Sequence, residues 1–303
     1  MRRVRGWLEY SALWIVLKIA GLLPRGAARR LGAWCAHLLF ALQPKLRRTA
    51  EFNLALAFPD WSDARRSETI RRMVVQLGWM AGEFSQFPKY SRTNISSIVS
   101  LEGHENFLAA RANGKGVLIL TGHIGAWELS PYAHALYGYP LSFLARAVEN
   151  SKVDELVNRY RGLAGNEPIE KNRAAREMLR ILGRGETIGI LADQNTLPEE
   201  GVFVDFFGVP ACTTSGLARI ALRTGAAVVP GYVLWDDPSA IYRLCFEPSV
   251  QLARSGDEEQ DVLENTARFA KVIERVIREH PDQWVWVHKR WKTRPPGEKP
   301  LYP

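Results

Sequence analysis

A chain of 303 residues, of which 47% are hydrophobic and 24% charged, has the composition of a folded protein, which excludes wholesale disorder. The formal net charge of +8 is uneven, because the first 50 residues hold ten basic side chains against one acidic side chain, Glu9. The three cysteines, Cys35, Cys212 and Cys245, form an odd set without metal-ligand spacing, and their apolar neighbours predict buried free thiols in a reducing compartment.

The amino-terminal segment combines its basic residues with aromatic and aliphatic ones between Trp7 and Leu23. Glu9 and Lys18 interrupt the apolar run and Pro24 ends it, so a membrane span of about 20 apolar residues is marginal. The run also lacks the small-residue cleavage site of a signal peptide. A basic patch suits nucleic acid or an anionic membrane. The apolar neighbours favour a helix in a membrane interface and no nucleic-acid partner; the alternative is a basic helix packed on its own domain.

Apolar periodicity and proline breaks predict four helices in the first 94 residues, over 4–22, 26–43, 46–57 and 62–86. Beyond residue 97, strands alternate with helices. The expected strands are 117–121, 141–145, 187–191, 226–233 and 240–246, and the expected helices are 104–113, 126–137, 151–164, 172–184, 213–224 and 258–279. This alternation predicts an α/β fold with a mixed or largely parallel central sheet flanked by helices. We expect a helical, membrane-associating region over residues 1–94 and one α/β domain over residues 95–303.

The most informative motif directly follows the strand expected at 117–121, where Gly122 leads into the sequence HIGAWE over residues 123–128. His123 would lie at the carboxyl end of a strand and Glu128 in the first turn of the next helix, where α/β proteins usually bind ligands. A histidine with a nearby carboxylate can remove a proton from a hydroxyl. On one helix the two side chains would lie roughly 140° apart, so the pair requires a strand-to-helix turn. The alternative is that both residues merely cap the helix.

A second group of residues follows the strand expected at 187–191. Asp193 should lie at the carboxyl end of that strand, and Gln194, directly after it, is a candidate substrate-binding residue. The aromatic segment that follows predicts either an apolar wall for an acyl chain or a β-hairpin in the core. Its candidate substrate-binding residues are Phe203, Phe206, Phe207 and Gly208.

Two basic segments complete the candidates. Arg159 and Arg161 lie late in an expected helix and could recognise phosphate or carboxylate, or could simply face solvent. Residues 284–292, with the sequence WVWVHKRWK, could bind anionic headgroups or a phosphopantetheine carrier, or could form an edge strand closed by positive residues. The sequence has no serine-hydrolase elbow, zinc-hydrolase pattern or phosphate loop, so we expect no metal. Without an evident covalent nucleophile, direct transfer to a hydroxyl is favoured.

Six blocks in this order resemble the bacterial lipid A biosynthesis (lauroyl/myristoyl) acyltransferases, which belong to the wider lysophospholipid acyltransferase superfamily. The blocks are NLALAFP at 53–59, the HIGAWE motif, Arg161, ADQ at 192–194, GVFVDFFG at 201–208 and QWVWVHKRWKTRP at 283–295. The likeness extends over essentially the whole chain.

The resemblance implies an enzyme on the cytoplasmic face of the bacterial inner membrane. It would move a fatty acyl group from acyl carrier protein to a hydroxyl of a lipid A precursor, with acyl-carrier protein or acyl-CoA as co-substrate and no other cofactor. His123 would be the general base and Glu128 its orienting partner. Arg161, with Arg159 as a possible substitute, and Asp193 would match the family's functional arginine and aspartate. Arg161 or backbone amides after Gly122 could stabilise the oxyanion.

Other readings stay open. Related enzymes with the same histidine–glutamate spacing acylate phosphatidylinositol mannosides, other glycolipids or lysophospholipids, and their donor can be acyl-CoA. A different class would be a membrane lipid-binding protein without turnover.

Overall fold

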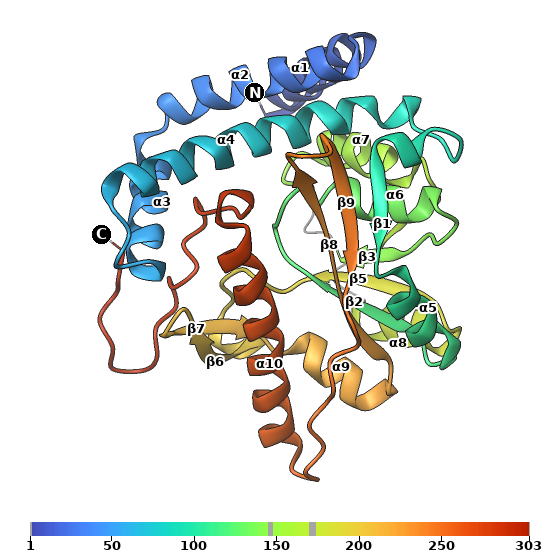
Figure 1. The fold of residues 1–303 in the computed structure, drawn as a ribbon, viewed down its shortest axis with the longest axis vertical. Coiled ribbons are helices and arrows are strands. Elements are labelled where there is room, and N and C mark those ends of the chain that lie inside the picture. The colour runs from blue at the N-terminus through green and yellow to red at the C-terminus, as the bar shows by residue number, and fades with distance from the viewer. Residues whose placement is uncertain (1, 145–147, 170–173, 303) are drawn as a thin grey trace.

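The computed structural model describes residues 2–144, 148–169 and 174–302. Within these residues, four α-helices come first and six more follow among and after the strands (Figure 1). They are α1 (Arg2–Leu22), α2 (Arg25–Ala41), α3 (Pro44–Ala57), α4 (Asp63–Gln86), α5 (His104–Ala112), α6 (Leu129–Leu136), α7 (Ser151–Gly162), α8 (Ala174–Gly183), α9 (Gly216–Thr224) and α10 (Glu258–Glu279).

Seven strands form the central sheet in the order β1-β9-β8-β2-β5-β3-β4. They are β1 (Val99–Glu102), β2 (Val117–Thr121), β3 (Ser142–Leu144), β4 (Glu167–Ile169), β5 (Thr187–Leu191), β8 (Ala227–Asp236) and β9 (Ile241–Phe246). Neighbouring strands run parallel except for the antiparallel pair β8–β9. The predicted α/β fold with a mixed, largely parallel sheet is therefore confirmed. A separate antiparallel hairpin joins β6 (Gly201–Phe206) to β7 (Val209–Thr214).

Some elements differ from the sequence-based prediction. Strands β1 and β4 were not predicted, because each is only three or four residues long and lacks a continuous apolar run. The helix expected from residue 126 begins at Leu129. The expected strand at 141–145 is observed over Ser142–Leu144, and its last residue lies outside the described residues, as do residues 172 and 173 of the expected helix 172–184.

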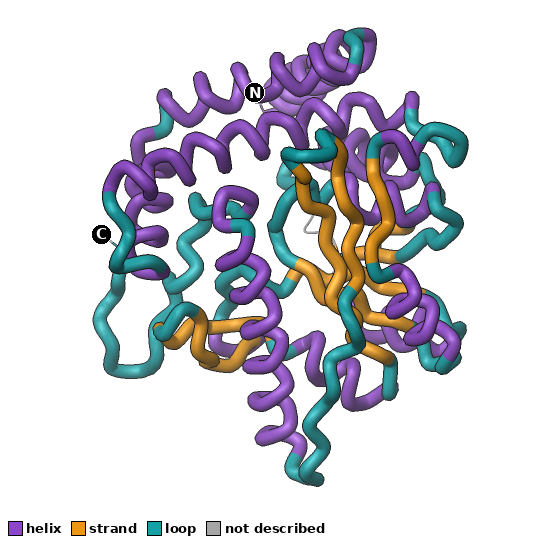
Figure 2. The backbone as a smooth tube through the Cα atoms, in the orientation of Figure 1, coloured by secondary structure: helices purple, strands orange, loops and turns teal. Residues whose placement is uncertain are grey.

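Alternating side chains of the strands bury the two faces of the sheet in two separate hydrophobic clusters. Leu118 and Leu120 of β2 join a cluster that includes residues of α8, α9 and α10, whereas Val117 and Ile119 join a cluster that includes residues of α5, α6 and α7. Figure 2 shows this arrangement, with helices on both sides of the strands. The burial of the first four residues of β2 on both faces thus explains why this run is uniformly apolar rather than alternating.

Helices α1 and α2 lie on the outer side of α4 (Figure 1). Two of the arginines counted in the basic amino-terminal cluster point inward rather than to the surface. Arg25 and Arg29 approach the fully buried Glu83 carboxylate at 2.8 and 3.8 Å. The Arg29 guanidinium also lies over the rings of Trp79 on α4 and Trp235 on β8, 3.8 and 4.0 Å from their centroids. Part of the predicted membrane-facing charge therefore anchors α2 to the protein interior.

Cysteine environments match the expectation only in part: Cys212 and Cys245 are buried, but Cys35 on α2 is half-buried. Among the residues that the structure describes, no helix combines the length and the apolar character needed to cross a membrane.

Candidate functional site

The register of the two central parallel strands brings His123 and Asp193 together. Thr121 at the end of β2 pairs with Leu191 at the end of β5, and the Ala192 amide donates to the Thr121 carbonyl at 2.9 Å. His123 and Asp193 each lie two residues beyond this last pair. Their side chains meet at the carboxyl edge of the sheet, where His123 Nδ1 lies 2.9 Å from Asp193 Oδ1.

Asp193 is fully buried and its carboxylate is held from several directions. Besides the imidazole on Oδ1, the second oxygen, Oδ2, accepts the backbone amide of His123 at 2.9 Å and the indole Nε1–H of Trp284 at 2.8 Å. Gly122 allows this approach, because a Cβ there would lie 2.9 Å from the Asp193 Cγ. Burial alone would raise the pKa of Asp193, but the charge of His123 and the hydrogen bonds outweigh it and lower that pKa to about 2. The carboxylate therefore stays ionised.

The ionised Asp193 defines the tautomer of His123. With Nδ1–H donating to the carboxylate, Nε2 carries the lone pair and faces the amide nitrogen of Gln194 at 3.3 Å. Burial lowers the pKa of His123, but Asp193 and, more weakly, Glu128 raise it by more, so it lies above its usual value. The imidazole is thus oriented as a base, with its free nitrogen directed away from Asp193.

The backbone after His123 is held by strand β8 and by the segment after α10. The Gly125 amide donates to the Gln283 carbonyl at 2.6 Å, and the Ala126 amide donates to the Val233 carbonyl at 3.0 Å. Gly125 has φ +58°, and a Cβ at this position would lie 1.9 Å from the Val233 oxygen. These bonds delay the start of α6 to Leu129. They also occupy amides that the sequence suggested as oxyanion donors.

Glu128 contacts Arg161 rather than His123. The carboxylate accepts a bidentate pair of hydrogen bonds from the guanidinium, at 2.8 Å from Nε and 2.5 Å from Nη2. The expectation that Glu128 would bond to the imidazole is therefore wrong in this structure, because Asp193 occupies Nδ1. Of the two candidate arginines, Arg161 faces the site, whereas Arg159 is exposed on the other side of α7. Such a bidentate pair fixes the plane of the guanidinium.

A cavity of about 270 Å³ opens beside these groups. Its polar end holds His123, Glu128 and Arg161, and its remaining wall is largely apolar. Gly189 of β5 contributes no side chain, which leaves room over the sheet. The other lining residues are Ile119, Thr121, Trp127, Ser130, Pro131, Leu141, Phe143, Leu144 and Leu191. The arrangement can place an apolar chain next to a base and a cation.

The predicted aromatic wall does not line this cavity; its aromatic residues lie in the β6–β7 hairpin. Phe206 and Phe207 are buried in the core, Phe203 is half-buried, and Gly208 is exposed at the turn. Phe207 and Gly208 both have positive φ, as in the two-residue turns that suit hairpins. Of the two predictions for this segment, an apolar wall or a core hairpin, the structure shows the core hairpin.

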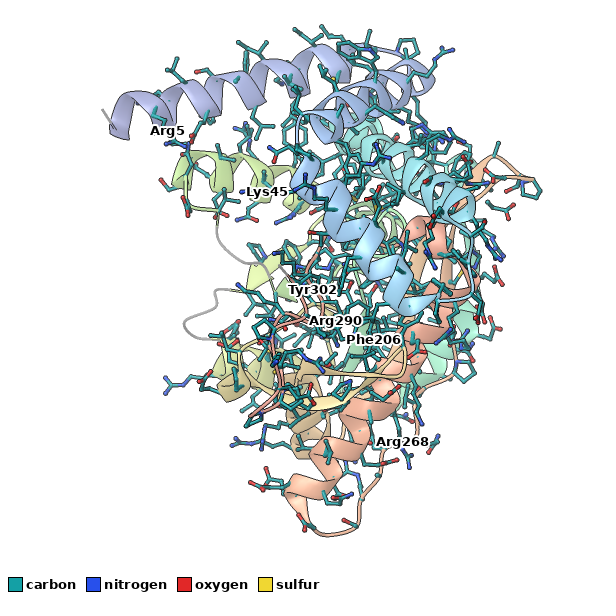
Figure 3. All side chains as sticks on the ribbon, turned by 90° about the vertical axis from the view of Figure 1, so that its left-hand side faces the viewer. Arg5, Lys45, Phe206, Arg268, Arg290 and Tyr302 are labelled. Atoms are coloured by element: carbon teal, nitrogen blue, oxygen red, sulfur yellow. The ribbon has the colours of Figure 1, made fainter. Side chains whose placement is uncertain are left out.

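The basic aromatic segment near the carboxyl end forms no strand, and its tryptophans and Arg290 are buried, whereas Lys289 and Lys292 are exposed. Trp284, Trp286, Trp291 and Arg290 are each at most 1% exposed. Arg290 donates to the Cys212 carbonyl and to Thr213 on β7, and Figure 3 shows it in the interior beside Phe206 and Tyr302. The prediction of a surface for headgroups or a carrier, or an edge strand, is wrong for these side chains, because they complete the core beneath Asp193. The contact of Trp284 with Asp193 had no signal in the sequence.

Comparison with known proteins adds a family context to this geometry. Residues 1–293 match the model of a family described as bacterial lipid A biosynthesis acyltransferase. A lipid A biosynthesis acyltransferase of Haemophilus influenzae is 28% identical over 272 residues, which cover 89% of this chain and 81% of the relative. The lipid A biosynthesis lauroyltransferase of Escherichia coli is 26% identical over 298 residues, or 98% of this chain and 94% of the relative. The myristoyltransferase of the same organism is 26% identical over 265 residues, or 85% and 80%.

Proposed function

Because the chain belongs to the bacterial lipid A biosynthesis acyltransferases, we propose that it moves a fatty acyl group to a hydroxyl of a lipid A precursor. The donor in this proposal is a thioester of acyl carrier protein, and His123 is the general base. The observation that carries this mechanism is the hydrogen bond of 2.9 Å between His123 Nδ1 and the buried Asp193 carboxylate. It leaves Nε2 unprotonated at the edge of the cavity.

The proposed reaction needs only one proton carrier. His123 Nε2 removes the proton of the acceptor hydroxyl while its oxygen attacks the thioester carbonyl, forming a tetrahedral oxyanion. When the intermediate collapses, the carbon–sulfur bond breaks and the imidazolium returns the proton to the leaving thiolate. General-base assistance of this kind contributes about 10²–10⁴ in rate. The hydroxyl would displace the Gln194 amide, which lies 3.3 Å from Nε2 in the structure.

In this proposal Asp193, not Glu128, orients the base. Its carboxylate holds the Nδ1–H tautomer and stabilises the imidazolium as it forms, the role of the carboxylate in hydrolase triads. Glu128 acts on Arg161 instead. Since the amides of His123, Gly125 and Ala126 already donate to other groups, we assign oxyanion stabilisation to Arg161, whose guanidinium Glu128 holds at the cavity.

The apolar part of the cavity would receive the acyl chain of the donor. Its volume of about 270 Å³ is close to the lower end of typical ligand pockets, roughly 300–1,000 Å³. Gly189 offers a direct test, because an added Cβ would meet only Leu141, at an ordinary distance of 3.5 Å. Gly189→Val should keep the fold and lower acyl transfer by filling the cavity. Unchanged transfer with a folded variant would place the acyl chain elsewhere.

The function is tested by acyl transfer in detergent with purified protein. Lauroyl- and myristoyl-carrier protein and lauroyl-CoA are the donors, and the acceptors are a tetra-acylated lipid A precursor, a phosphatidylinositol mannoside and a lysophospholipid. His123→Ala is compared with His37→Ala, which alters an exposed histidine on α2. A mass gain of one acyl chain on the lipid A precursor, lost only in His123→Ala, supports the proposal. A gain only on another acceptor would replace the proposed substrate, and wild-type transfer by His123→Ala would refute the mechanism.

We also propose that the outer face of α1 and α2 binds the anionic cytoplasmic face of the bacterial inner membrane. This face exposes large apolar side chains between basic ones, a combination typical of interfacial helices. The exposed apolar residues are Trp7, Leu8, Trp14, Ile15, Val16, Ile19, Leu22, Trp34, Leu38, Leu39 and Leu42, and the exposed basic residues include Arg5, Lys18 and Arg30.

Vesicle flotation tests this surface. Replacing Trp34, Leu39 and Leu42 together by Ser should strongly weaken binding to anionic vesicles, because each buried CH₂ group contributes about 0.8 kcal/mol. The matched control replaces Leu108, Leu197 and Leu263, which are exposed on other elements. Equal binding by both triple variants would place the membrane contact elsewhere.

A further inference from the structure

Trp284 contacts Asp193, the partner of His123, from a distant part of the chain. Its indole Nε1–H donates to Asp193 Oδ2 at 2.8 Å, across 91 residues of sequence. The same oxygen accepts the His123 amide, and the other oxygen accepts the His123 imidazole. Trp284 therefore supplies one of three hydrogen bonds to this carboxylate and the only one of the three that does not come from His123.

The indole is itself rigidly placed. Trp284 is 1% exposed, and its ring lies 4.6 Å from that of Trp286 and 5.9 Å from that of Phe206, measured between centroids. Its backbone forms an isolated bridge with Ile124 in the loop that follows His123. A donor held by packing on one side and by the catalytic loop on the other can fix a neighbouring group without moving itself.

A carboxylate needs such a constraint, because rotation about the Cβ–Cγ bond of aspartate has broad, roughly two-fold preferences. With Oδ2 held by two donors, Oδ1 is left to face the imidazole. Resting on the proposed function, we propose that Trp284 is a positioning residue of the acyl transfer: its indole N–H fixes the Asp193 carboxylate so that His123 presents the unprotonated Nε2 to the acceptor hydroxyl. The same bond favours the ionised carboxylate, in keeping with the lowered pKa of Asp193.

The chain provides matched controls for this idea. Trp286 and Trp291 are as deeply buried as Trp284, and each also donates its indole N–H. Their acceptors are backbone carbonyl oxygens, those of Pro281 at 2.6 Å and Phe206 at 3.3 Å. Replacement of any of the three by Phe removes an indole and a hydrogen bond from the core, but only Trp284→Phe removes a donor from the Asp193 carboxylate.

The expected effect has a definite sign. The unprotonated Asp193–His123 pair carries one negative charge, and the indole N–H stabilises it. Loss of this donor makes the pair hold its proton more tightly, so the midpoint of the acid limb of kcat/KM should move upward by about half a pH unit or more. Looser placement of the base should also lower kcat by about tenfold or more. Trp286→Phe should leave the midpoint unchanged.

The experiment measures kcat/KM against pH for wild type, Trp284→Phe and Trp286→Phe, with His123→Ala in the same assay. An upward shift confined to Trp284→Phe supports the proposal, and equal losses in both variants with unmoved midpoints would overturn it. Failure of the proposed function gives a different result, because the wild type would then transfer no acyl group or His123→Ala would keep its activity.

A second measurement needs neither turnover nor a folded Trp284 variant. In wild-type protein, the indole N–H resonance of Trp284 in an NMR titration should follow the same midpoint as the His123 imidazole and lose that titration in His123→Ala. The resonance of Trp286 should not respond. A Trp284 resonance that ignores the titration of His123 would overturn the positioning role.

Discussion

Replacing Asp193 by Asn tests which carboxylate controls the base. The amide retains the shape of the side chain but has only one acceptor oxygen. If that oxygen takes the Oδ2 position, it accepts both the His123 amide and the Trp284 indole, and the NH₂ group then faces His123 Nδ1. The opposite orientation would place the NH₂ group against two N–H donors. The first orientation is therefore favoured, and it forces Nδ1 to accept, so the proton moves to Nε2.

The size of the effect follows from this change of tautomer. A histidine that carries its proton on Nε2 cannot take the proton of an acceptor hydroxyl. The equivalent aspartate-to-asparagine change in a serine protease lowers kcat by about 10⁴. Here we expect a loss of about 10³–10⁴ in kcat, with a loss of stability of only about 1–3 kcal/mol because two of the three hydrogen bonds to the carboxylate are retained by the oxygen. Loss of the negative charge should also lower the pKa of His123, since Asp193 is the main group that raises it.

The matched variant is Glu128→Gln, which removes the charge that holds Arg161 but leaves the imidazole and Asp193 in contact. Acyl transfer and the NMR titration of the His123 imidazole are measured for both variants. Both should lose activity, but the midpoint of the imidazole titration should fall clearly in Asp193→Asn and much less in Glu128→Gln. A larger shift in Glu128→Gln, or Asp193→Asn activity within tenfold of wild type, would refute the assignment.

Three further outcomes are expected. Because the pKa of His123 is raised and the base must be unprotonated, wild-type kcat/KM should rise with pH at a midpoint above 6.5. The stability that the His123 contact adds is present below pH 6.5 and is lost as pH rises through that midpoint. A kinetic midpoint below 6.5 would contradict the raised pKa. Gly125→Ala should lower the melting temperature strongly, because its Cβ would lie 1.9 Å from a backbone oxygen. The control Gly114→Ala has a similar positive φ and open surroundings, so it measures only the backbone strain of about 1–3 kcal/mol. Equal losses of melting temperature in the two variants would exclude the clash. Asn53→Ala should lower the free energy of unfolding by about 2–3 kcal/mol, because buried Asn53 donates to the carbonyls of Trp286 and His288 at 2.7 Å each. Thermal or denaturant unfolding measures this loss. A loss below about 0.5 kcal/mol would show that other contacts hold the carboxyl-terminal segment.

The sequence alone determined the class of fold and the position along the chain of His123, the proposed base. Short-range patterns carry this information, because a continuous apolar run such as 117–121 is compatible with few structures other than a buried strand. Gly122 ends that run and His123 follows it, so the sequence places His123 just beyond the end of a strand. The order of motifs was enough to identify the family by resemblance, and the comparisons confirmed it.

Tertiary structure decided which groups surround the base. The contact of His123 with Asp193, 70 positions apart, depends on the adjacency and register of β2 and β5, and no local pattern encodes which strands pair. The spacing of His123 and Glu128 suggested a direct contact, but the turn at Gly125, held by Val233, directs Glu128 to Arg161 instead.

Burial decided the remaining differences. The basic aromatic segment has the composition of a binding surface, but its three tryptophans and Arg290 are enclosed, and Trp284 contacts Asp193 at the carboxyl edge of the sheet. Likewise, Phe206 and Phe207 pack into the core. Gly189, which lines the cavity without a side chain, was not among the residues predicted from the sequence. Composition determines which side chains are apolar enough to be buried. Only the packing of distant segments determines which of them form the core and which line a site.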